Sequence, residues 1–351
     1  MFYAIHAQEE AAIPSPMTVG REIEGNERGR FRERAHTFMK VAIVGAGGVG
    51  GYFGGRLARA GEDVVFIARG EHLRAITTSG LKVDSINGDF HVDPASATDD
   101  PASVGEVDYV LVAVKSWQLP EAIETMRPMV GDKTSIVPLQ NGVEAPGQLS
   151  RAFGAGRVLG GLCSVISMLS GPGHVRHVGA DPSIAFGELD HSRSERGERL
   201  KDSFSRAEGV QVKVPADIHV AMWNKFILIA PWSGVGALTR APIGVTRSLP
   251  ETRSLLKRAM EEIHTLARAR GIAMERESIE QAMGFLDDLP REGIASMQRD
   301  ILAGRPSELD AQNGAVVRLG KEAGVSTPVH DMIHACLLPL ELRARGRLQF
   351  D

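Results

Sequence analysis

The sequence has few cysteines and no hydrophobic run long enough to cross a membrane. Its 351 residues include two cysteines, Cys163 and Cys336, which lie far apart and form no CxxC pair. Neither a disulfide framework nor a metal site is therefore indicated. The most apolar stretch, residues 226–238, is shorter than the ~20 residues that span a bilayer and contains Pro231, so it predicts a buried helix. These features favour a cytoplasmic protein with no membrane partner.

The chain also has little net charge of either sign. The formal net charge is −4, which provides no long-range attraction for phosphate backbones or anionic lipids. Nucleic acid is therefore not expected as a partner. Apolar residues make up 43% of the chain, which is enough for two hydrophobic cores. Two domains are expected, because single domains cluster at about 100 to 150 residues.

The N-terminal segment lacks the features of a folded or exported region. Residues 1–38 carry several Glu and Arg side chains, but no apolar periodicity and no hydrophobic segment of the signal-peptide type. We expect these residues to form a disordered leader. Because the first core strand starts directly after Met39, we also expect Met39 to be the natural start of the protein.

From residue 39 onward the sequence alternates strands with helices, which is typical of a parallel sheet. Residues 39–44 form a β-branched run that ends in a glycine-rich turn, and residues 52–60 have helical spacing. Strand, turn and helix are therefore predicted. Asn87-Gly88 predicts a hairpin turn between two short strands. The further predicted strands lie at residues 63–68, 81–86, 89–92, 109–114 and 135–139.

The pattern changes at Asp217. Beyond it, long amphipathic stretches such as residues 249–270 and 307–323 predict helices, with hardly any strand signal. We therefore predict an α/β protein with a Rossmann-type dinucleotide-binding domain over residues 39–215. An all-helical domain that carries substrate and catalytic residues is predicted over residues 216–345.

The glycine-rich turn has the GxGxxG spacing of dinucleotide-binding sites. Gly45 permits the tight turn, Gly47 lets the backbone approach a pyrophosphate, and Gly50 allows the helix to pack closely on the strand. Gly48 and Val49 complete the turn, whose amide groups would face the anion at the helix N-terminus. The motif alone is weak in a chain with 39 glycines, but here it lies between a predicted strand and a predicted helix. A purely structural glycine turn is the alternative.

The residue that follows the second predicted strand indicates which cofactor binds. NAD sites place an Asp or Glu there to bind the ribose 2′-hydroxyl, whereas this chain has Arg69. A guanidinium at that position can pair with a 2′-phosphate, so NADPH is the expected cofactor. A solvated surface arginine is the alternative.

Several short motifs follow one another in a recognisable order. They are Gly45–Gly50, Val114–Gln118, Gln140–Gly142, Trp223–Phe226, Ser296–Asp300 and Glu308. In this order and approximate spacing the chain resembles the ketopantoate reductase family, also called 2-dehydropantoate 2-reductases, from residue 39 nearly to the C-terminus. The resemblance implies reduction of 2-dehydropantoate to pantoate with NADPH, a step of pantothenate biosynthesis.

The resemblance places Lys225 at the position of the family's general acid. A cation suits this position, because negative charge builds on the ketone oxygen as hydride arrives at the C2 carbonyl. Within residues 221–238, Lys225 and Asn224 are the only strongly polar side chains, and a charge on such a helix needs a cleft or a partner. A helix-end lysine that reaches solvent is the alternative.

Glu308 resembles a family glutamate that contacts the active site from a later helix. There it would orient Lys225 or a bound water and keep the ammonium charged. Ser307 and Glu308 also follow Pro306, where a helix is expected to begin, so capping and helix-dipole effects are an alternative explanation.

Four more residues lie at positions of the shared motifs. By resemblance, Asn141 and Lys115 contact both cofactor and substrate, and both follow predicted strands, where open parallel sheets bind ligands. Gln118 is expected near the cofactor, and Ser296 is expected to bind the substrate carboxylate. The alternatives are a structural turn at Asn141, an ordinary helix N-cap at Ser296 and solvated surface positions for the other two.

The chain departs from the family in the substrate pocket. Where the family has three asparagines on and after the lysine helix, this chain has Ile229, Ser233 and Ile243, of which Ser233 is still expected to bind substrate. An apolar wall discriminates less strongly than a pocket that hydrogen-bonds a hydroxyl, so the departure concerns which 2-oxo acid is accepted.

Three hypotheses about function follow. The first is reduction of 2-dehydropantoate, and the second is the same reaction on another 2-oxo acid. The third is a non-catalytic NADP-binding regulator, against which the retention of Lys225 and Glu308 argues. The expected partner is a small 2-oxo acid, and a homodimer is compatible with the sequence.

Overall fold

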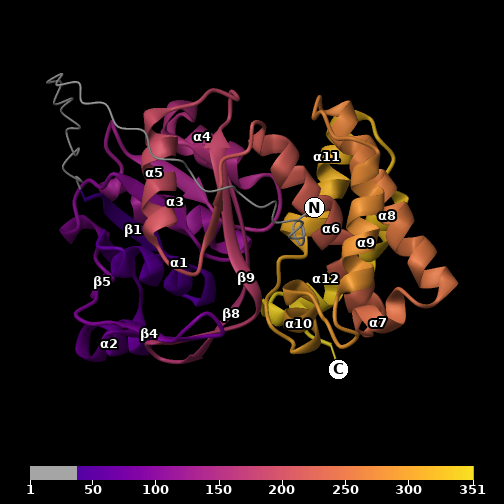
Figure 1. Ribbon diagram of the computed structural model, residues 1–351. Coiled ribbons are helices and arrows are strands. Elements are labelled where there is room, and N and C mark those ends of the chain that lie inside the picture. The colour runs from indigo at the N-terminus through magenta and orange to yellow at the C-terminus, as the bar shows by residue number, and fades with distance from the viewer. Residues whose placement is uncertain (1–37, 351) are drawn as a thin grey trace, which may run out of the picture. The chain divides into compact units, whose positions relative to one another are not determined.

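The structure is a computed structural model that describes residues 38–350 (Figure 1). The expected leader, apart from Phe38, therefore lies outside the described residues. The strands are β1 (Lys40–Val44), β2 (Asp63–Ile67), β3 (Leu81–Ser85), β4 (Phe90–Val92), β5 (Ser96–Thr98), β6 (Tyr109–Val112), β7 (Ser135–Pro138), β8 (Leu159–Gly171), β9 (His174–Glu188) and β10 (Gln211–Lys213). The helices are α1 (Gly48–Arg59), α2 (Gly70–Ser79), α3 (Leu119–Met126), α4 (Ala145–Phe153), α5 (Glu195–Arg206), α6 (Ile218–Thr239), α7 (Ile243–Thr246), α8 (Pro250–Ala269), α9 (Glu277–Asp288), α10 (Ser296–Leu302), α11 (Ala315–Ala323) and α12 (Pro328–Ala344).

A parallel sheet in the order β5-β2-β1-β6-β7 lies at the centre of the first half of the chain. Along β1, Val41 and Ile43 pack on the side of α1, and Ala42 and Val44 pack on the side of α3 and α4. Both faces of the strand are apolar because helices cover both faces of the sheet. The strand that follows β1 in the sequence, β2, pairs with one edge of β1, and the later strand β6 pairs with the opposite edge. The ends of β1 and β6 therefore form the topological switch point, where such sheets bind ligands.

A second sheet has the order β10-β9-β3-β4, with β8 paired to β9. Only its β3–β4 hairpin, with Asn87-Gly88 at the turn, is predicted from the sequence, and this hairpin is confirmed. The ribbon of β8 and β9 is longer than any other strand pair and is not predicted. Helix α1 packs between the two sheets, and its Tyr52, Phe53 and Leu57 are fully buried.

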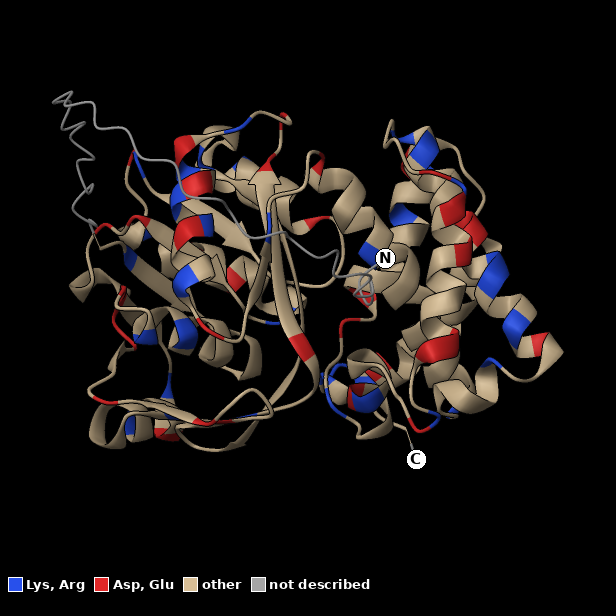
Figure 2. Cartoon of the chain, viewed as in Figure 1, with Lys and Arg blue, Asp and Glu red and all other residues tan. Residues whose placement is uncertain are grey.

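Helices α6 to α12 form a second core, grouped together in Figure 1. α6 contacts α8, α9, α10 and α12, and its segment 226–238 is the buried helix that the sequence predicts. The fold class, a Rossmann-type α/β part followed by an all-helical part, is confirmed. Among residues 38–350, no helix combines the length and the apolar character that a bilayer crossing requires. Figure 2 shows acidic and basic residues interspersed along α8, whereas α9 carries acidic residues and no Lys or Arg.

One predicted helix begins later than expected. Residues 307–309 are not helical, and a π-helical turn, η5 (Asp310–Gly314), leads into α11. The backbone N–H of Ser307 donates to both carboxylate oxygens of Glu341 on α12, at 3.1 and 3.0 Å, and its hydroxyl donates to the same group at 2.5 Å. These bonds hold the segment away from a helical path. Glu308 still lies at the start of the helical turn, since its carbonyl oxygen accepts a bond from the Gln312 N–H at 3.0 Å, but its side chain is buried and not exposed.

Candidate active site

The glycine-rich turn joins β1 to α1 at the switch point. Gly45 has φ +99°, a left-handed conformation that glycine adopts without strain. A side chain at Gly50 would place its Cβ 2.0 Å from the Gly45 carbonyl oxygen, so this position requires glycine for packing. A Cβ at Gly47 would meet nothing within 4 Å, so the backbone there is open to a ligand. The three glycines thus have the separate properties that a pyrophosphate site requires.

Gly48 and Val49 differ from these three. A Cβ at Gly48 would lie 2.5 Å from the carbonyl oxygen of Ser167, because β8 passes directly over the start of α1. The Val49 side chain packs against the core beneath the sheet. Gly48 can therefore offer a cofactor only its backbone, and the Val49 side chain is partly buried.

A cavity of about 220 Å³ opens beside the turn. Arg69 lies at its edge, and its guanidinium pairs with the Glu121 carboxylate of α3 at 2.6 Å. Both side chains are more than 60% exposed, so the pair is held weakly and can be displaced by a ligand. The residues that line the cavity are Val44, Gly45, Ala46, Gly47, Ile67, Ala68, Arg69, His72, Val114, Gln118, Glu121, Ala122 and Thr125. Arg69 and Gln118, predicted at the cofactor, thus share one cavity with Gly45 and Gly47.

Lys225 lies on α6 and extends to the second sheet. Asp217 caps this helix by accepting a bond from the Val220 N–H at 3.1 Å. The Lys225 ammonium donates to the carbonyl oxygen of Cys163 on β8 at 2.5 Å. The lysine is therefore partly buried at the junction of α6 and β8, and not at a helix end in solvent.

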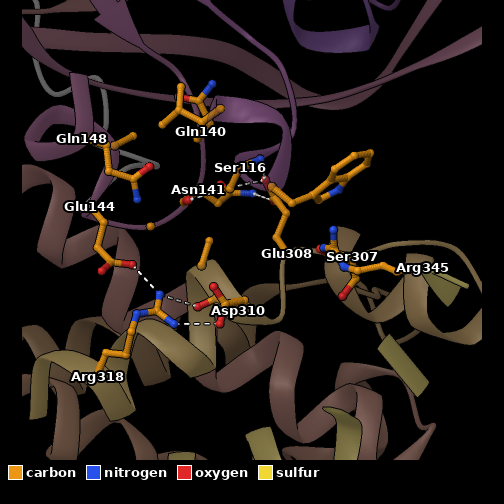
Figure 3. A pocket seen from close by; sticks show the side chains of 15 residues that line it. Ser116, Gln140, Asn141, Glu144, Gln148, Ser307, Glu308, Asp310, Arg318 and Arg345 are labelled. Atoms are coloured by element: carbon orange, nitrogen blue, oxygen red, sulfur yellow. Dashed lines mark hydrogen bonds and ion pairs between the residues drawn. The ribbon is translucent and has the colours of Figure 1, made fainter. Parts of the chain in front are cut away.

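Glu308 connects the helical part to the ends of β6 and β7 (Figure 3). One carboxylate oxygen accepts bonds from the Ser116 hydroxyl at 2.7 Å and from the Ser116 N–H at 3.1 Å. The other accepts a bond from the side-chain amide of Asn141 at 3.0 Å. Glu308 is only 4% exposed, so these donors compensate a buried charge. Its hydrogen bonds thus fix Ser116 and Asn141, a different contact from the one with Lys225 expected from the resemblance.

The thiol of Cys163 lies in the electrostatic range of both charges. Burial raises the pKa of this thiol, the Lys225 ammonium acts to lower it, and the Glu308 carboxylate acts to raise it. Cys163 and Cys336 are both free cysteines. With its pKa raised, Cys163 is a neutral thiol at neutral pH.

Lys115 follows β6 and pairs with Asp300 of α10 at 2.9 Å. Asp300 also accepts bonds from the guanidinium of Arg305 at 2.8 and 3.1 Å. Gln118 accepts a bond from the Lys115 N–H at 3.2 Å, which closes the short helical turn of residues 116–118. The Lys115 side chain is 43% exposed, so its ammonium remains accessible beside Asp300.

The predicted substrate residues of the helical part differ in their accessibility. Ser233 is 0% exposed, and its hydroxyl lies 2.6 Å from both the Ile229 carbonyl oxygen and the side-chain amide oxygen of Gln312, either of which can accept its proton. The prediction that Ser233 binds substrate is therefore corrected, since its hydroxyl is sealed inside the helical core. Ile243 is also buried there, and Ile229 is half-buried at its margin. Ser296 is half-buried as the first residue of α10, and no side-chain bond caps this helix.

Four residues at this site are not predicted from the sequence: Ser116, Glu121, Asp300 and His72. Ser116 and Asp300 lie inside motifs that carry the family resemblance. The sequence therefore indicates that they lie near the site, but not which residues they contact. Glu121 and His72 have no local sequence signal, because their importance depends on residues that the fold brings near them.

Comparison with known proteins identifies relatives over most of the chain. The profile described as Ketopantoate reductase PanE/ApbA matches residues 41–191, and the profile of its C-terminal domain matches residues 217–341. A 2-dehydropantoate 2-reductase of Mesorhizobium japonicum is 31% identical over 318 residues, which cover 85% of this chain and 96% of the relative. An uncharacterized oxidoreductase of Bacillus subtilis is 31% identical over 301 residues, with 85% of this chain and 98% of the relative covered.

Solved structures show the same likeness. A PanE/ApbA family ketopantoate reductase of Ralstonia eutropha is 33% identical with a TM-score of 0.80, and the match covers 88% of this chain and 100% of that chain. A D-mandelate dehydrogenase solved with NADH and anilino(oxo)acetate shares the fold with a TM-score of 0.78 at 22% identity, over 88% of this chain and 99% of that one.

Proposed function

Because the chain belongs to the ketopantoate reductase family, we propose that it reduces the C2 carbonyl of a 2-oxo acid, with NADPH as cofactor and Lys225 as general acid. The observation that carries this proposal is the position of Lys225. Its ammonium is held on the Cys163 carbonyl, between α6 and the strand that passes over the glycine-rich turn.

The residues at the switch point fit a dinucleotide. Gly47 leaves its backbone open, and the cavity beside it extends to Arg69. A bound nicotinamide dinucleotide would supply the hydride. Asn141 and Ser116 would help to bind it, and Glu308 fixes the orientation of both by accepting their hydrogen bonds.

Lys225 would stabilise the oxygen of the substrate as negative charge develops and then transfer a proton to it from Nζ. The Cys163 carbonyl holds the ammonium in place while leaving its other N–H groups to donate. Lys115 and Ser296 would bind the substrate carboxylate. To do so, the Lys115 ammonium would leave its ion pair with Asp300.

The substrate we favour is 2-dehydropantoate, the acid after which the Mesorhizobium japonicum relative is named. The second candidate is another 2-oxo acid with a less polar side chain. It is favoured by Ile229, which presents an aliphatic side chain one helical turn from Lys225, and by the sealed hydroxyl of Ser233.

The test is NADPH oxidation with a panel of 2-oxo acids that differ in side-chain polarity. The highest kcat/KM with 2-dehydropantoate would support the first substrate, and a higher value with an aliphatic or aromatic 2-oxo acid would support the second. Tight NADPH binding without reduction of any acid would overturn the proposal in favour of a non-catalytic role.

Gly47→Val should separate cofactor binding from folding. A Cβ at this position would meet no protein atom within 4 Å, so the melting temperature should change little. The added side chain would occupy the space that a pyrophosphate needs, so the dissociation constant of NADPH should rise about 10-fold or more. Fluorescence titration and thermal unfolding measure the two effects.

The matched control is Gly50→Ala, whose Cβ would lie 2.0 Å from the Gly45 carbonyl oxygen. This variant should lose stability strongly, in contrast to Gly47→Val. Unchanged NADPH affinity in Gly47→Val would show that the cofactor does not approach this turn.

Arg69→Asp should reverse the cofactor preference. Loss of a charge-assisted contact with the 2′-phosphate should lower kcat/KM with NADPH by about 10-fold to 100-fold. The kcat/KM with NADH should change little, because NADH has no 2′-phosphate. Steady-state kinetics with both cofactors measure the ratio. Arg74→Asp is the control, because Arg74 is exposed on α2 and pairs with Glu71.

Equal efficiency with both cofactors in the unmodified protein would remove Arg69 from this role. Glu121 would then be the residue to test, since its carboxylate lines the same cavity and could accept a ribose hydroxyl.

A further inference from the structure

His72 lies on α2 and contacts the glycine-rich turn. Its Nε2 lies 2.7 Å from the carbonyl oxygen of Ala46, the residue between Gly45 and Gly47. Its Nδ1 lies 2.9 Å from the backbone nitrogen of Gly173, in the turn between β8 and β9. The imidazole is half-buried and lines the proposed cofactor cavity. One side chain therefore joins two segments that are 127 residues apart in the sequence (173 − 46).

The two partners decide which ring nitrogen carries the proton. A backbone N–H is always a donor, so Nδ1 must accept the bond from Gly173. In the neutral ring the proton then lies on Nε2, which donates to the Ala46 carbonyl. Both nitrogens are therefore used, and the ring orientation is fixed.

The bond to Ala46 fixes the orientation of a whole peptide group. In a trans peptide the C=O and the following N–H point in opposite directions. With the Ala46 carbonyl held by His72, the N–H of Gly47 points away from the imidazole. A rotated peptide would instead present a carbonyl oxygen to an approaching phosphate, which would repel it.

We propose that His72 is a positioning residue for cofactor binding, which holds the Ala46–Gly47 peptide so that the Gly47 N–H can bind the pyrophosphate. The inference rests on the proposed binding of NADPH at this turn. It assigns the orientation of this peptide to a residue outside the glycine motif.

The Gly173 turn gives His72 a rigid support. Gly173 has φ +66°, and its carbonyl accepts a bond from the Lys82 N–H at 2.9 Å. A Cβ at Gly173 would lie 2.9 Å from the Cβ of Ala75, which is one helical turn after His72. The turn therefore packs on the same face of α2 and restricts movement of the imidazole.

Two substitutions separate the two hydrogen bonds of His72. In His72→Gln the amide nitrogen reaches the position of Nε2, so the bond to Ala46 is kept and the one to Gly173 is lost. In His72→Asn the amide oxygen reaches the position of Nδ1, so the bond to Gly173 is kept and the one to Ala46 is lost. The control is His91→Asn, because His91 bonds the Ser79 carbonyl at 2.7 Å and is exposed outside the cofactor cavity.

The experiment measures dissociation constants for NADPH and for ADP-ribose, which carries the pyrophosphate without the nicotinamide. We expect His72→Asn to weaken both ligands by about 10-fold and His72→Gln to change them by less than about threefold. The kcat at saturating NADPH and the KM of the 2-oxo acid should stay unchanged in both. Equal losses of affinity in the two variants would overturn the inference. A greater loss in His72→Gln, the variant that loses the bond to Gly173, would overturn it as well. If the unmodified protein binds neither ligand, the proposed function itself fails. This failure differs from failure of the His72 inference, in which the unmodified protein binds both ligands but the two variants do not differ as expected.

Discussion

Replacement of Lys225 by alanine is expected to lower kcat by about 10²-fold to 10⁴-fold, the usual contribution of a general acid. In the proposed mechanism this ammonium both stabilises the developing alkoxide and protonates it. The dissociation constant of NADPH should barely change, because the bond of Lys225 goes to the Cys163 carbonyl and not to the glycine-rich turn. Steady-state kinetics on the best 2-oxo acid and direct cofactor titration measure the two quantities.

Lys225→Arg distinguishes the two tasks of this ammonium. A guanidinium keeps the positive charge but does not release its proton near neutral pH, so charge stabilisation should survive and proton transfer should not. Its activity should lie between that of the alanine variant and that of the unmodified protein. Lys257→Ala is the matched control, since Lys257 is an exposed lysine of α8 that pairs with Glu280. Near-normal turnover in Lys225→Ala would show the assignment to be wrong, and Lys115 would be tested next.

Replacement of Glu308 by alanine should cost about 10-fold to 100-fold in kcat/KM. The carboxylate accepts bonds from the Ser116 hydroxyl, the Ser116 N–H and the Asn141 amide, and its loss leaves these donors without their charged acceptor. Because these residues follow β6 and β7, the loss should include weaker NADPH binding, unlike that of Lys225→Ala. Kinetics combined with cofactor titration would show this difference.

A double-mutant cycle tests the contact itself. Glu308→Ala combined with Asn141→Ala should be much less impaired than the product of the single effects, since either change removes the same bond. A second cycle with Lys225→Ala tests the family-based expectation that Glu308 and Lys225 act as a unit. Glu322→Ala, at an exposed glutamate of α11 paired with Arg270, is the control. Independent losses in the Asn141 cycle would exclude the proposed orienting role.

The sequence predicts local features of this site well and their partners poorly. Gly45, Gly47 and Gly50 are identified from spacing alone, because each role depends on the backbone of a strand–turn–helix unit. The position of Glu308 is likewise found by resemblance. Its contacts with Ser116 and Asn141 span 192 and 167 residues, and no local pattern encodes contacts at that separation.

Two parts of the fold show why the remaining predictions fail. Beyond Cys163 the residues of β8 are mostly exposed, so the strand lacks the regular apolar alternation by which strands are recognised. Ser233 is expected at the substrate because it occupies a position where the family has an asparagine. The packing of α6 against Gln312 instead buries its hydroxyl, and this depends on how neighbouring helices meet.

The course of β8 has a consequence for how this protein can be re-engineered. The strand carries the Cys163 carbonyl, which holds Lys225, and four residues later the Ser167 carbonyl, which lies against Gly48. A regular strand advances about 3.3 Å per residue, so four residues span at most about 13 Å, and this interval also contains the register shift between Ser164 and Ile166. One inserted residue would lengthen this interval and turn every later side chain to the opposite face. Libraries that seek new substrates should therefore keep the length of β8 constant and vary side chains on α6 and α10.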